Sequence, residues 1–254
     1  MPPNVAYITA AYNASQFIMD CIKSVHDQSY DGNIHHYIID DASTDDTVDI
    51  VLNNGHFNKI EAFDYDLYES DRLTLIALRK NGRQGRARNF GIKHAWEWAD
   101  CFVILDADDI KYPLFTSRHV EEWLRDPQKI GVVYSDYDIF DTNDNSIRIE
   151  YKFAYSYERL HQECIVSSGA LVSKQAILQC GLYDEQASPA EDYGMWLRIS
   201  NFFIMRHIPE SLWQYKVHNN NSTNASNIKQ IQQAHQIMAN NYNLWRQNPQ
   251  GYLC

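Results

Sequence analysis

The amino-acid sequence predicts an α/β fold with a mostly parallel central sheet flanked by helices. Short apolar runs alternate with segments whose apolar residues recur at helical spacing, which is the β–α–β–α order of such folds. The unbroken apolar run at 101–105 is typical of a strand buried on both faces. Acidic clusters at 40–41 and 106–109 follow directly on two of these runs. Parallel sheets bind ligands beyond the carboxyl ends of their strands, so both clusters are expected beside a ligand.

The first half of the chain is expected to carry the regular alternation. Apolar runs predict strands at residues 5–9, 35–39, 73–78 and 101–105. Apolar periodicity predicts helices at 17–25 and 85–98, and a capping signal at 43–46 predicts a helix around 48–52. Residues 54–72 are polar and aromatic, which indicates an insertion or an irregular connection.

The second half is less regular. A helix at 114–125 is expected to stop at Asp126-Pro127, and a strand with alternating aromatic residues follows at 131–140. Residues 141–163 are rich in tyrosine and charge and are expected to form a mobile or a substrate-facing region. The remaining expected elements are a strand at 170–172 and helices ending at 180, spanning 191–201 and beginning near 227.

Composition excludes several classes of protein. With 254 residues, 44% hydrophobic and 22% charged, the chain is globular rather than disordered. A net charge of −11 argues against nucleic acid and against anionic membranes as partners. No apolar run approaches the ~20 residues of a membrane-spanning helix, and the start shows no signal peptide. Five cysteines without a CxxC pair indicate reduced thiols and no zinc cluster. We therefore expect a cytoplasmic protein, with peripheral attachment to a membrane left open.

The acidic clusters have a functional and a structural interpretation. Asp106, Asp108 and Asp109 are hard oxygen ligands suited to Mg²⁺ or Mn²⁺, and their mutual repulsion calls for a cation or for hydrogen-bond donors. The alternative is a solvated turn that caps the next helix. Asp40 and Asp41 could likewise accept hydrogen bonds from a nucleobase or a ribose, or merely begin a capping turn.

Three further segments carry candidate chemistry. Residues 82–89 open a helix with three arginines, which favours an anion site, although the pattern is neither GxGxxG nor a P-loop. The alternative is a solvated basic turn. Glu191 and Asp192 begin a helix, where they either favour its dipole or hold a general base. His218 precedes an asparagine-rich run, and a lone histidine is more often structural than a ligand.

Taken in order, these segments resemble the family-2 glycosyltransferases of the GT-A fold, which has a Rossmann-like domain. The resemblance covers about residues 4–222, and seven matching segments carry it: 8–13, 40–45, 85–91, 106–109, 181–185, 191–198 and 215–218. Each segment is a weak signal alone, and their shared order is the strong one. The resemblance implies a nucleotide-sugar-binding half at 1–110, an acceptor-binding and catalytic half at 111–226, and a C-terminal helix at 227–254.

The resemblance also implies roles for single residues. The residues that would bind the nucleotide sugar, including the ribose and the metal-bridged phosphates, are Thr9, Ala11, Tyr12, Asp41, Asn81, Gly85, Arg88, Asp106 and Asp108, with Asp40 a weaker candidate. The metal, Mn²⁺ or Mg²⁺, would be held by Asp108, Asp109 and His218. Asp192 would be the general base. Two departures affect the closing loop: Lys216 replaces the usual arginine, and one extra residue separates His218 from Ser222.

The implied reaction is an inverting transfer of a sugar from a nucleoside diphosphate, with a UDP-sugar the best guess, to an acceptor hydroxyl of a carbohydrate or glycoconjugate. Asp192 would deprotonate the acceptor. The C-terminal helix would pack on the domain or pair with a second subunit in a homodimer. The competing interpretations are an inactive nucleotide-sugar-binding module, a haloacid-dehalogenase-type phosphatase and a sugar nucleotidyltransferase.

Overall fold

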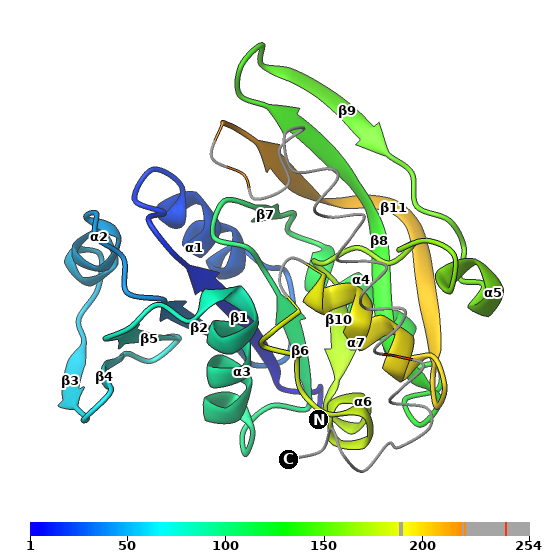
Figure 1. Ribbon diagram of the computed structural model, residues 1–254, viewed down its shortest axis with the longest axis horizontal. Coiled ribbons are helices and arrows are strands. Elements are labelled where there is room, and N and C mark those ends of the chain that lie inside the picture. Colours follow the sequence, from blue (N-terminus) through cyan, green and yellow to red (C-terminus); the bar gives the residue numbers. More distant parts are fainter. Residues whose placement is uncertain (188–189, 220, 222–241, 243–254) are drawn as a thin grey trace.

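The structure is a computed structural model that describes residues 1–187, 190–219, 221 and 242 (Figure 1). Its strands are β1 (Val5–Ala11), β2 (Ile34–Asp40), β3 (Asn58–Glu61), β4 (Tyr65–Glu69), β5 (Leu73–Leu78), β6 (Cys101–Ile104), β7 (Ile110–Lys111), β8 (Ile130–Asp141), β9 (Ser146–Glu150), β10 (Leu171–Ser173) and β11 (Ile204–Val217). Its helices are α1 (Ile18–His26), α2 (Thr47–Asn53), α3 (Arg83–Ala95), α4 (Phe115–Trp123), α5 (Tyr157–Leu160), α6 (Lys174–Cys180) and α7 (Glu191–Ile199).

One mixed sheet joins all of these strands, which confirms the predicted α/β class. Within the described residues the strand order is β3-β4-β5-β2-β1-β6-β10-β8-β11-β7, and β9 pairs with β8. The centre, β5-β2-β1-β6, is parallel, whereas β10 runs antiparallel to both of its neighbours, β6 and β8. The carboxyl ends of β1, β2 and β6 therefore lie at one edge of the sheet, where ligands of such sheets bind.

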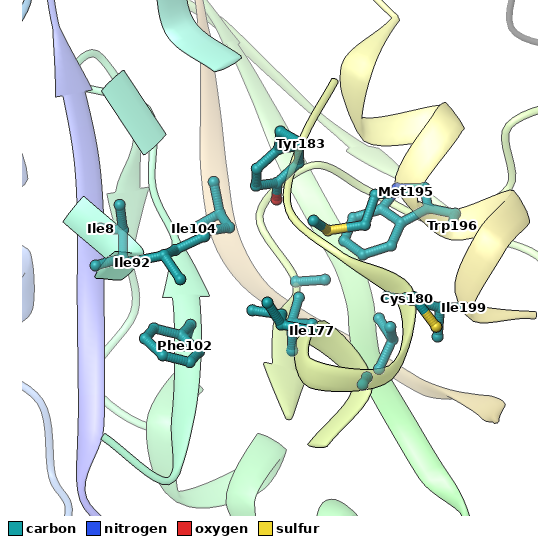
Figure 2. Packing of buried hydrophobic residues seen from close by; sticks show 14 of the residues in the cluster. Ile8, Ile92, Phe102, Ile104, Ile177, Cys180, Tyr183, Met195, Trp196 and Ile199 are labelled. Atoms are coloured by element: carbon teal, nitrogen blue, oxygen red, sulfur yellow. The ribbon is translucent and has the colours of Figure 1, made fainter. Parts of the chain in front are cut away.

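Helices cover both faces of this sheet, and the alternation along the strands explains why (Figure 1). Ile8 of β1 belongs to a core cluster with residues of α3, α6 and α7, whereas Tyr7 belongs to the cluster that α1 and α4 complete. Successive side chains of a strand point to opposite faces, so a strand covered on both faces is apolar throughout. Figure 2 shows the first cluster, in which Ile92 of α3 lies beside Ile8 and Ile104, and Trp196 of α7 lies beside Met195.

The close approach of α3 to the sheet depends on one glycine. A Cβ added to Gly91 would lie 2.4 Å from Cδ1 of Ile39 and 2.9 Å from Cγ2 of Ile8. Such distances are shorter than carbon atoms tolerate, so a side chain at position 91 would push the helix away from the sheet.

The structure corrects the prediction in several places. Residues 141–163 contain the strand β9 and the helix α5, neither of which was predicted. Residues 54–72 are not an irregular connection, because β3 and β4 form a hairpin within them that extends the sheet beyond β5. The long strand β11 was not predicted at all. Its pairing with β8 is interrupted by register shifts around Ser211, and Pro209 lies inside it, so its sequence lacks the regular alternation of a strand.

The predicted C-terminal helix beginning near residue 227 lies outside the described residues, except for Tyr242. The Tyr242 side chain is buried, and its hydroxyl donates a hydrogen bond to Oδ1 of Asn201 at 2.8 Å. None of the helices in the described part of the chain has the length and apolar character needed to cross a membrane.

Candidate active site

A cavity of about 690 Å³ opens at the carboxyl ends of β1, β2 and β6, where the sequence predicted a ligand site. The residues that line it are Ala10, Ala11, Tyr12, Asn13, Ala14, Phe17, Asp41, Asn81, Arg83, Gln84, Arg88, Asp106, Ala107, Asp108, Tyr137, Ser167, Ser168, Asp192, Trp213, Tyr215, His218 and Asn221. The cavity therefore brings together side chains from both predicted halves of the chain. Its size suits a ligand larger than a single sugar, since small-molecule sites occupy roughly 300–1,000 Å³.

Asp41 and the turn after β5 form one end of the cavity. The backbone nitrogen of Gly82 donates to both carboxylate oxygens of Asp41, at 2.9 and 3.1 Å, and Nδ2 of Asn81 donates to the Asp41 carbonyl oxygen at 3.0 Å. Burial raises the pKa of Asp41, and the hydrogen bond from Gly82 opposes that rise. Each carboxylate oxygen keeps an acceptor position besides its contact with Gly82. Asp41 can thus accept a hydrogen bond from an N–H or O–H of a ligand.

The loop after β1 is held over the same end of the cavity. Asn13 has a φ of 50°, and its Oδ1 accepts a hydrogen bond from the backbone nitrogen of Thr44 at 2.8 Å. Its own backbone nitrogen donates to Oγ of Ser43 at 2.9 Å. Left-handed backbone is tolerated better by asparagine than by most residues. These bonds tie the loops after β1 and β2 together and leave Tyr12 half-exposed at 53% beside them.

Arg88 is the electrostatic centre of the site. Its side chain is 1% exposed, and Nη2 donates to Oδ1 of Asp106 at 2.6 Å. Nη1 donates to Oε1 of Glu191 at 2.8 Å and to Oδ1 of Asp192 at 2.9 Å. Arg88 lines the cavity, as expected for a residue close to the nucleotide, and its guanidinium also holds three carboxylates. Because arginine presents its donors in a rigid planar fork, it fixes the relative positions of Asp106 and Asp192.

Asp192 reaches the cavity, whereas its neighbour Glu191 does not. The side chain of Asp192 is 22% exposed and that of Glu191 is 1% exposed. Burial raises the pKa of Asp192 to about 7; Arg88 opposes this rise, and the charges of Glu191 and Asp106 add to it. A carboxylate with such a pKa exchanges protons near neutral pH, which suits a general base.

The acidic residues after β6 lie in two environments: two of them line the cavity, and one is buried in the protein interior. Asp106 and Asp108 line the cavity, but Asp109 is only 2% exposed and accepts a hydrogen bond from the backbone nitrogen of Lys216 at 3.1 Å. Burial, followed by the charge of Asp108, holds the pKa of Asp109 well above its usual range. Asp109 thus fastens β11 to this segment and does not face a ligand.

Asp108, in the same acidic segment, contacts His218 at the cavity. Nε2 of His218 lies 2.9 Å from Oδ2 of Asp108, and its ring stacks on Phe17 with centroids 4.5 Å apart. Burial and the charge of Asp106 raise the pKa of Asp108. A divalent cation would offset that repulsion, and carboxylate and imidazole donors suit Mn²⁺.

The predicted metal set of Asp108, Asp109 and His218 is nevertheless not assembled. Across residues 1–187 and 190–219, with 221 and 242, no three His, Cys, Asp or Glu side chains converge as a metal site. The inward turn of Asp109 is the reason, since it removes Asp109 from the cavity and leaves Asp108 and His218 in contact there.

Three other predicted residues do not line the cavity either. Thr9 is fully buried in β1, and its Oγ1 lies 2.9 Å from Nε2 of His36. Gly85 is buried in α3, where an added Cβ would lie 3.4 Å from the carbonyl oxygen of Asp184. Asp40 is 2% exposed and accepts a hydrogen bond from the backbone nitrogen of Ser43 at 3.0 Å. Ala11, Tyr12, Asp41, Asn81, Arg88, Asp106, Asp108, Asp192 and His218 do line it.

Sequence reasoning missed the part of the cavity wall that the later strands supply. That wall consists of Tyr137 of β8, Ser167 and Ser168 of the loop before β10, and Trp213 and Tyr215 of β11. Alternating aromatic residues marked β8 as a strand without showing which ring faces a ligand. No local pattern distinguishes the two serines.

Comparison with known proteins agrees with this geometry. The family model described as glycosyl transferase family 2 matches residues 7–182. An uncharacterised glycosyltransferase of Haemophilus influenzae is 26% identical over 252 residues, covering 94% of this chain and 73% of the relative. Chondroitin synthase of Escherichia coli is 26% identical over 224 residues, covering 87% of this chain but only 30% of that enzyme.

Solved structures share the fold at lower sequence identity. TarS of S. aureus, residues 1–349 in complex with UDP, has a TM-score of 0.66 at 15% identity, and the match covers 92% of this chain and 65% of that one. The mannosyltransferase PcManGT of Pyrobaculum calidifontis, in complex with GDP-Man and Mn²⁺, has a TM-score of 0.67 at 20% identity, with 94% and 63% covered. This chain thus spans slightly less than two thirds of the solved chains that it matches. The sequence match, the GT-A-type fold and the cavity together place the chain in glycosyl transferase family 2.

Proposed function

We propose that this protein transfers a sugar from a UDP-sugar to an acceptor hydroxyl, with inversion at the anomeric carbon and with Asp192 as the general base. The observation that carries the proposal is the network around Arg88. One buried guanidinium holds Asp106, at the donor end of the cavity, and Asp192, at the acceptor side. The base and the acidic segment are thus held in a fixed relation across the space where the reacting bond would lie, as catalysis by orientation requires.

The donor end suits a nucleoside diphosphate. Asp41 follows β2 and can accept the imide N–H of uracil. Asp106 and Asp108 follow β6, which is separated from β2 by β1 in the sheet. Asp106, Asp108 and His218 would hold Mn²⁺ or Mg²⁺, which when bound offsets the negative charge that develops on the leaving diphosphate. TarS in complex with UDP shares this fold, which supports a uridine donor.

The acceptor side offers one accessible carboxylate. Asp192 would take the proton of the acceptor hydroxyl as its oxygen attacks the anomeric carbon and the diphosphate leaves. Among the described residues, Glu191 is too buried to touch a sugar, and Asp41, Asp106 and Asp108 are assigned here to the donor and its metal. We therefore assign none of them as the nucleophile of a covalent sugar intermediate. A single displacement by the acceptor inverts the anomeric configuration.

The end of β11 would shield the reaction from water. His218 contacts Asp108 and Phe17, and Nδ2 of Asn221 lies 3.3 Å from Oδ2 of Asp108. These contacts hold the chain after β11 across the acidic segment. Exclusion of water at this point limits hydrolysis of the donor.

Calorimetric titration of UDP into the protein, with Mn²⁺ and then with excess EDTA, tests the donor part of the proposal. Micromolar binding that requires the metal is the expected result. GDP, CMP and dTDP titrated in the same way are the controls, and tighter binding of any of them would overturn the uridine assignment. Absence of binding by every nucleotide would contradict a nucleotide-sugar donor. An inactive nucleotide-sugar-binding module would instead bind a nucleotide and fail to turn over a donor.

The Asp192→Asn variant tests the base. The amide keeps the size of the side chain and a hydrogen-bonding oxygen but cannot accept the proton, so we expect transfer to fall by about 10²–10⁴-fold. UDP binding should stay within twofold of the wild type. Transfer at the wild-type rate by Asp192→Asn would remove Asp192 from the base role.

A further inference from the structure

The hairpin of β8 and β9 carries an exposed apolar row. Figure 1 shows this hairpin reaching away from the helices at the top of the view, with β9 along its outer side. Ile147 and Ile149 of β9 are 66% and 47% exposed, and Tyr151, directly after the strand, is 71% exposed. Alternate residues of a strand share one face, so these three side chains lie in a row. Single exposed apolar residues are ordinary, whereas a row of them indicates an interaction surface.

The strand β9 is also an open edge of the sheet. It pairs with β8 on one side, and no described strand pairs with its other side. The backbone nitrogen of Lys152, just after β9, donates to Oδ1 of Asp136 in β8 at 2.7 Å. Because backbone groups alternate in direction along an antiparallel pair, the odd-numbered residues of this segment direct their N–H and C=O groups away from β8. Ile147, Ile149 and Tyr151 can therefore pair with another strand.

The opposite face of β9 carries two charges of opposite sign. Arg148 and Glu150 alternate with the apolar residues of the row. None of the salt bridges within the described residues includes either side chain. The cation and the anion flank Ile149 symmetrically. The segment 147–151 is therefore complementary in charge and in apolar character to a second copy of itself that runs in the opposite direction.

We propose that two copies of this chain pair through β9 as antiparallel strands, with the two-fold axis at Ile149. In this register Ile149 lies opposite the partner's Ile149, and Ile147 lies opposite the partner's Tyr151. Arg148 lies opposite the partner's Glu150, and two-fold symmetry repeats each of these contacts. The pairing joins the two sheets, closes both open edges and sets the apolar rows side by side. This interaction surface is separate from the cavity and does not depend on the proposed transfer reaction.

Charge selects this register over its neighbours. An axis at residue 148 would set Arg148 opposite the partner's Arg148, and an axis at residue 150 would set Glu150 opposite the partner's Glu150. Like charges directly opposite each other destabilise a pair of strands, whereas opposite charges stabilise it. Parallel pairing in register would also oppose like charges at both positions. The antiparallel pairing about Ile149 places each charge of β9 opposite its counterion and each apolar residue of the row opposite an apolar residue.

The strand β3, at another edge of the sheet, has a similar pattern but different contacts. Lys59, Ile60 and Glu61 also place a cation and an anion on either side of an apolar residue. Nζ of Lys59, however, already lies 2.7 Å from Oε1 of Glu61 in its own strand and 3.9 Å from Oδ2 of Asp66. Ile60 is the single apolar residue of that strand, so no row forms. The edge of β3 therefore supplies a matched control for the edge of β9.

Sedimentation velocity at increasing protein concentration tests for the dimer. A pair of short strands forms an interface at the small end of the range for specific complexes, so we expect a reversible dimer with a Kd of about 10–100 μM. The buffer should hold about 0.15 M NaCl, because salt at that concentration screens charges over about 8 Å and limits the repulsion between two chains of net charge −11.

Charge reversal tests the register. Arg148→Glu and Glu150→Arg each set like charges opposite each other, so each variant alone should dimerise at least about tenfold more weakly than the wild type. Mixing these two variants in equal amounts restores opposite charges at both positions, and a heterodimer should form with about the wild-type Kd. The double variant Arg148→Glu/Glu150→Arg should dimerise like the wild type for the same reason. Ile149→Lys sets two cations at the axis and should abolish the dimer, whereas Lys59→Glu on β3 should leave it unchanged.

Thermal melting and UDP binding serve as controls, since the side chains of β9 do not line the cavity. Every variant should melt within a few degrees of the wild type and bind UDP as the wild type does. The proposed pairing is wrong if the wild type remains monomeric at several hundred micromolar, or if a dimer persists in Ile149→Lys. It is also wrong if the mixture of the two charge-reversed variants stays monomeric, or if Lys59→Glu weakens the dimer as much as Arg148→Glu does.

Discussion

Replacing Arg88 with methionine removes the only positive charge that contacts Asp106, Glu191 and Asp192 among the described salt bridges. Methionine has a similar length and an apolar character, so the packing of the stem is kept and the charge is lost. Arg88 is 1% exposed, which means that water cannot take its place without opening the site. The variant therefore leaves three carboxylates facing one another in a partly buried space.

The size of the effect follows from burial. Removing one partner of a buried ion pair costs about 3–5 kcal/mol, because the remaining charge stays desolvated. Each kcal/mol lowers the melting temperature by about 2–4 °C for a chain of this size. We therefore expect Arg88→Met to melt about 6–20 °C below the wild type at pH 8.

The penalty should shrink in acid. Without the guanidinium the folded-state pKa of Asp192, which burial already raises, should rise further. A carboxyl group with a raised folded-state pKa contributes stability below the unfolded pKa that is lost as the pH rises. At pH 5 the variant can neutralise part of its cluster by protonation. The difference in melting temperature from the wild type should therefore be smaller at pH 5 than at pH 8.

The assay is thermal melting by circular dichroism at both pH values, with Arg125→Met as the matched control. Arg125 pairs with Glu122 at 2.9 Å, the distance of the Arg88–Asp192 pair, but its side chain is 62% exposed. Exposed pairs contribute about 0–1 kcal/mol. Adding Glu191→Gln to Arg88→Met removes one uncompensated charge and should restore part of the loss. Equal melting shifts for the two arginine variants, or a shift independent of pH, would refute the reasoning.

Three further predictions concern the base, the acidic segment and the helix packing. The proposed base Asp192 would have to be deprotonated to act, and its pKa is raised to about 7, so the single-turnover transfer rate should rise with pH and be about tenfold below its plateau at pH 6. A flat profile between pH 5 and 9 would contradict this role. Asp108→Asn should raise the Mn²⁺ concentration needed for UDP binding at least tenfold, measured by calorimetry, with the exposed Asp144→Asn as the control. Gly91→Val should lower the free energy of unfolding by about 1–3 kcal/mol in urea titrations, because its Cβ would lie 2.4 Å from Cδ1 of Ile39; unchanged stability would show that α3 can move away freely.

Local patterns in the sequence were sufficient for the central sheet. The strand β6 is an unbroken apolar run, and β1 and β2 are largely apolar, because both of their faces are covered. Such runs are recognisable without knowledge of the partner strands. The hairpin of β3 and β4 was not predicted, because it lies at the edge of the sheet. Every residue of β3 is exposed there, so its sequence has no alternation of apolar and polar residues. The strand β11 was not predicted, because its register shifts interrupt the alternation of apolar and polar residues that marks a strand.

The candidate site, like the sheet, could be predicted from the sequence only in part. The positions of Asp41, Asp106, Asp108 and Asp192 at a common cavity could be predicted, because each follows a recognisable strand or begins a recognisable helix. The residues that these side chains contact could not be predicted. The contacts of Arg88 join residues 18, 103 and 104 positions apart in the chain, and no local pattern encodes such a distance.

The sequence by itself thus determined the α/β class, the family and the segments that supply the acidic side chains, because these depend on local periodicity and on short motifs. Only the tertiary structure decided which of those side chains face the cavity. Asp109 turns inward because the backbone of Lys216 meets it there, and Arg88 holds carboxylates because two distant segments converge on α3. The aromatic wall of Tyr137 and Trp213 likewise exists only where β8 and β11 lie side by side. The direction in which a side chain points and the residues that it contacts depend on packing between distant segments. Both therefore become visible only in the folded chain.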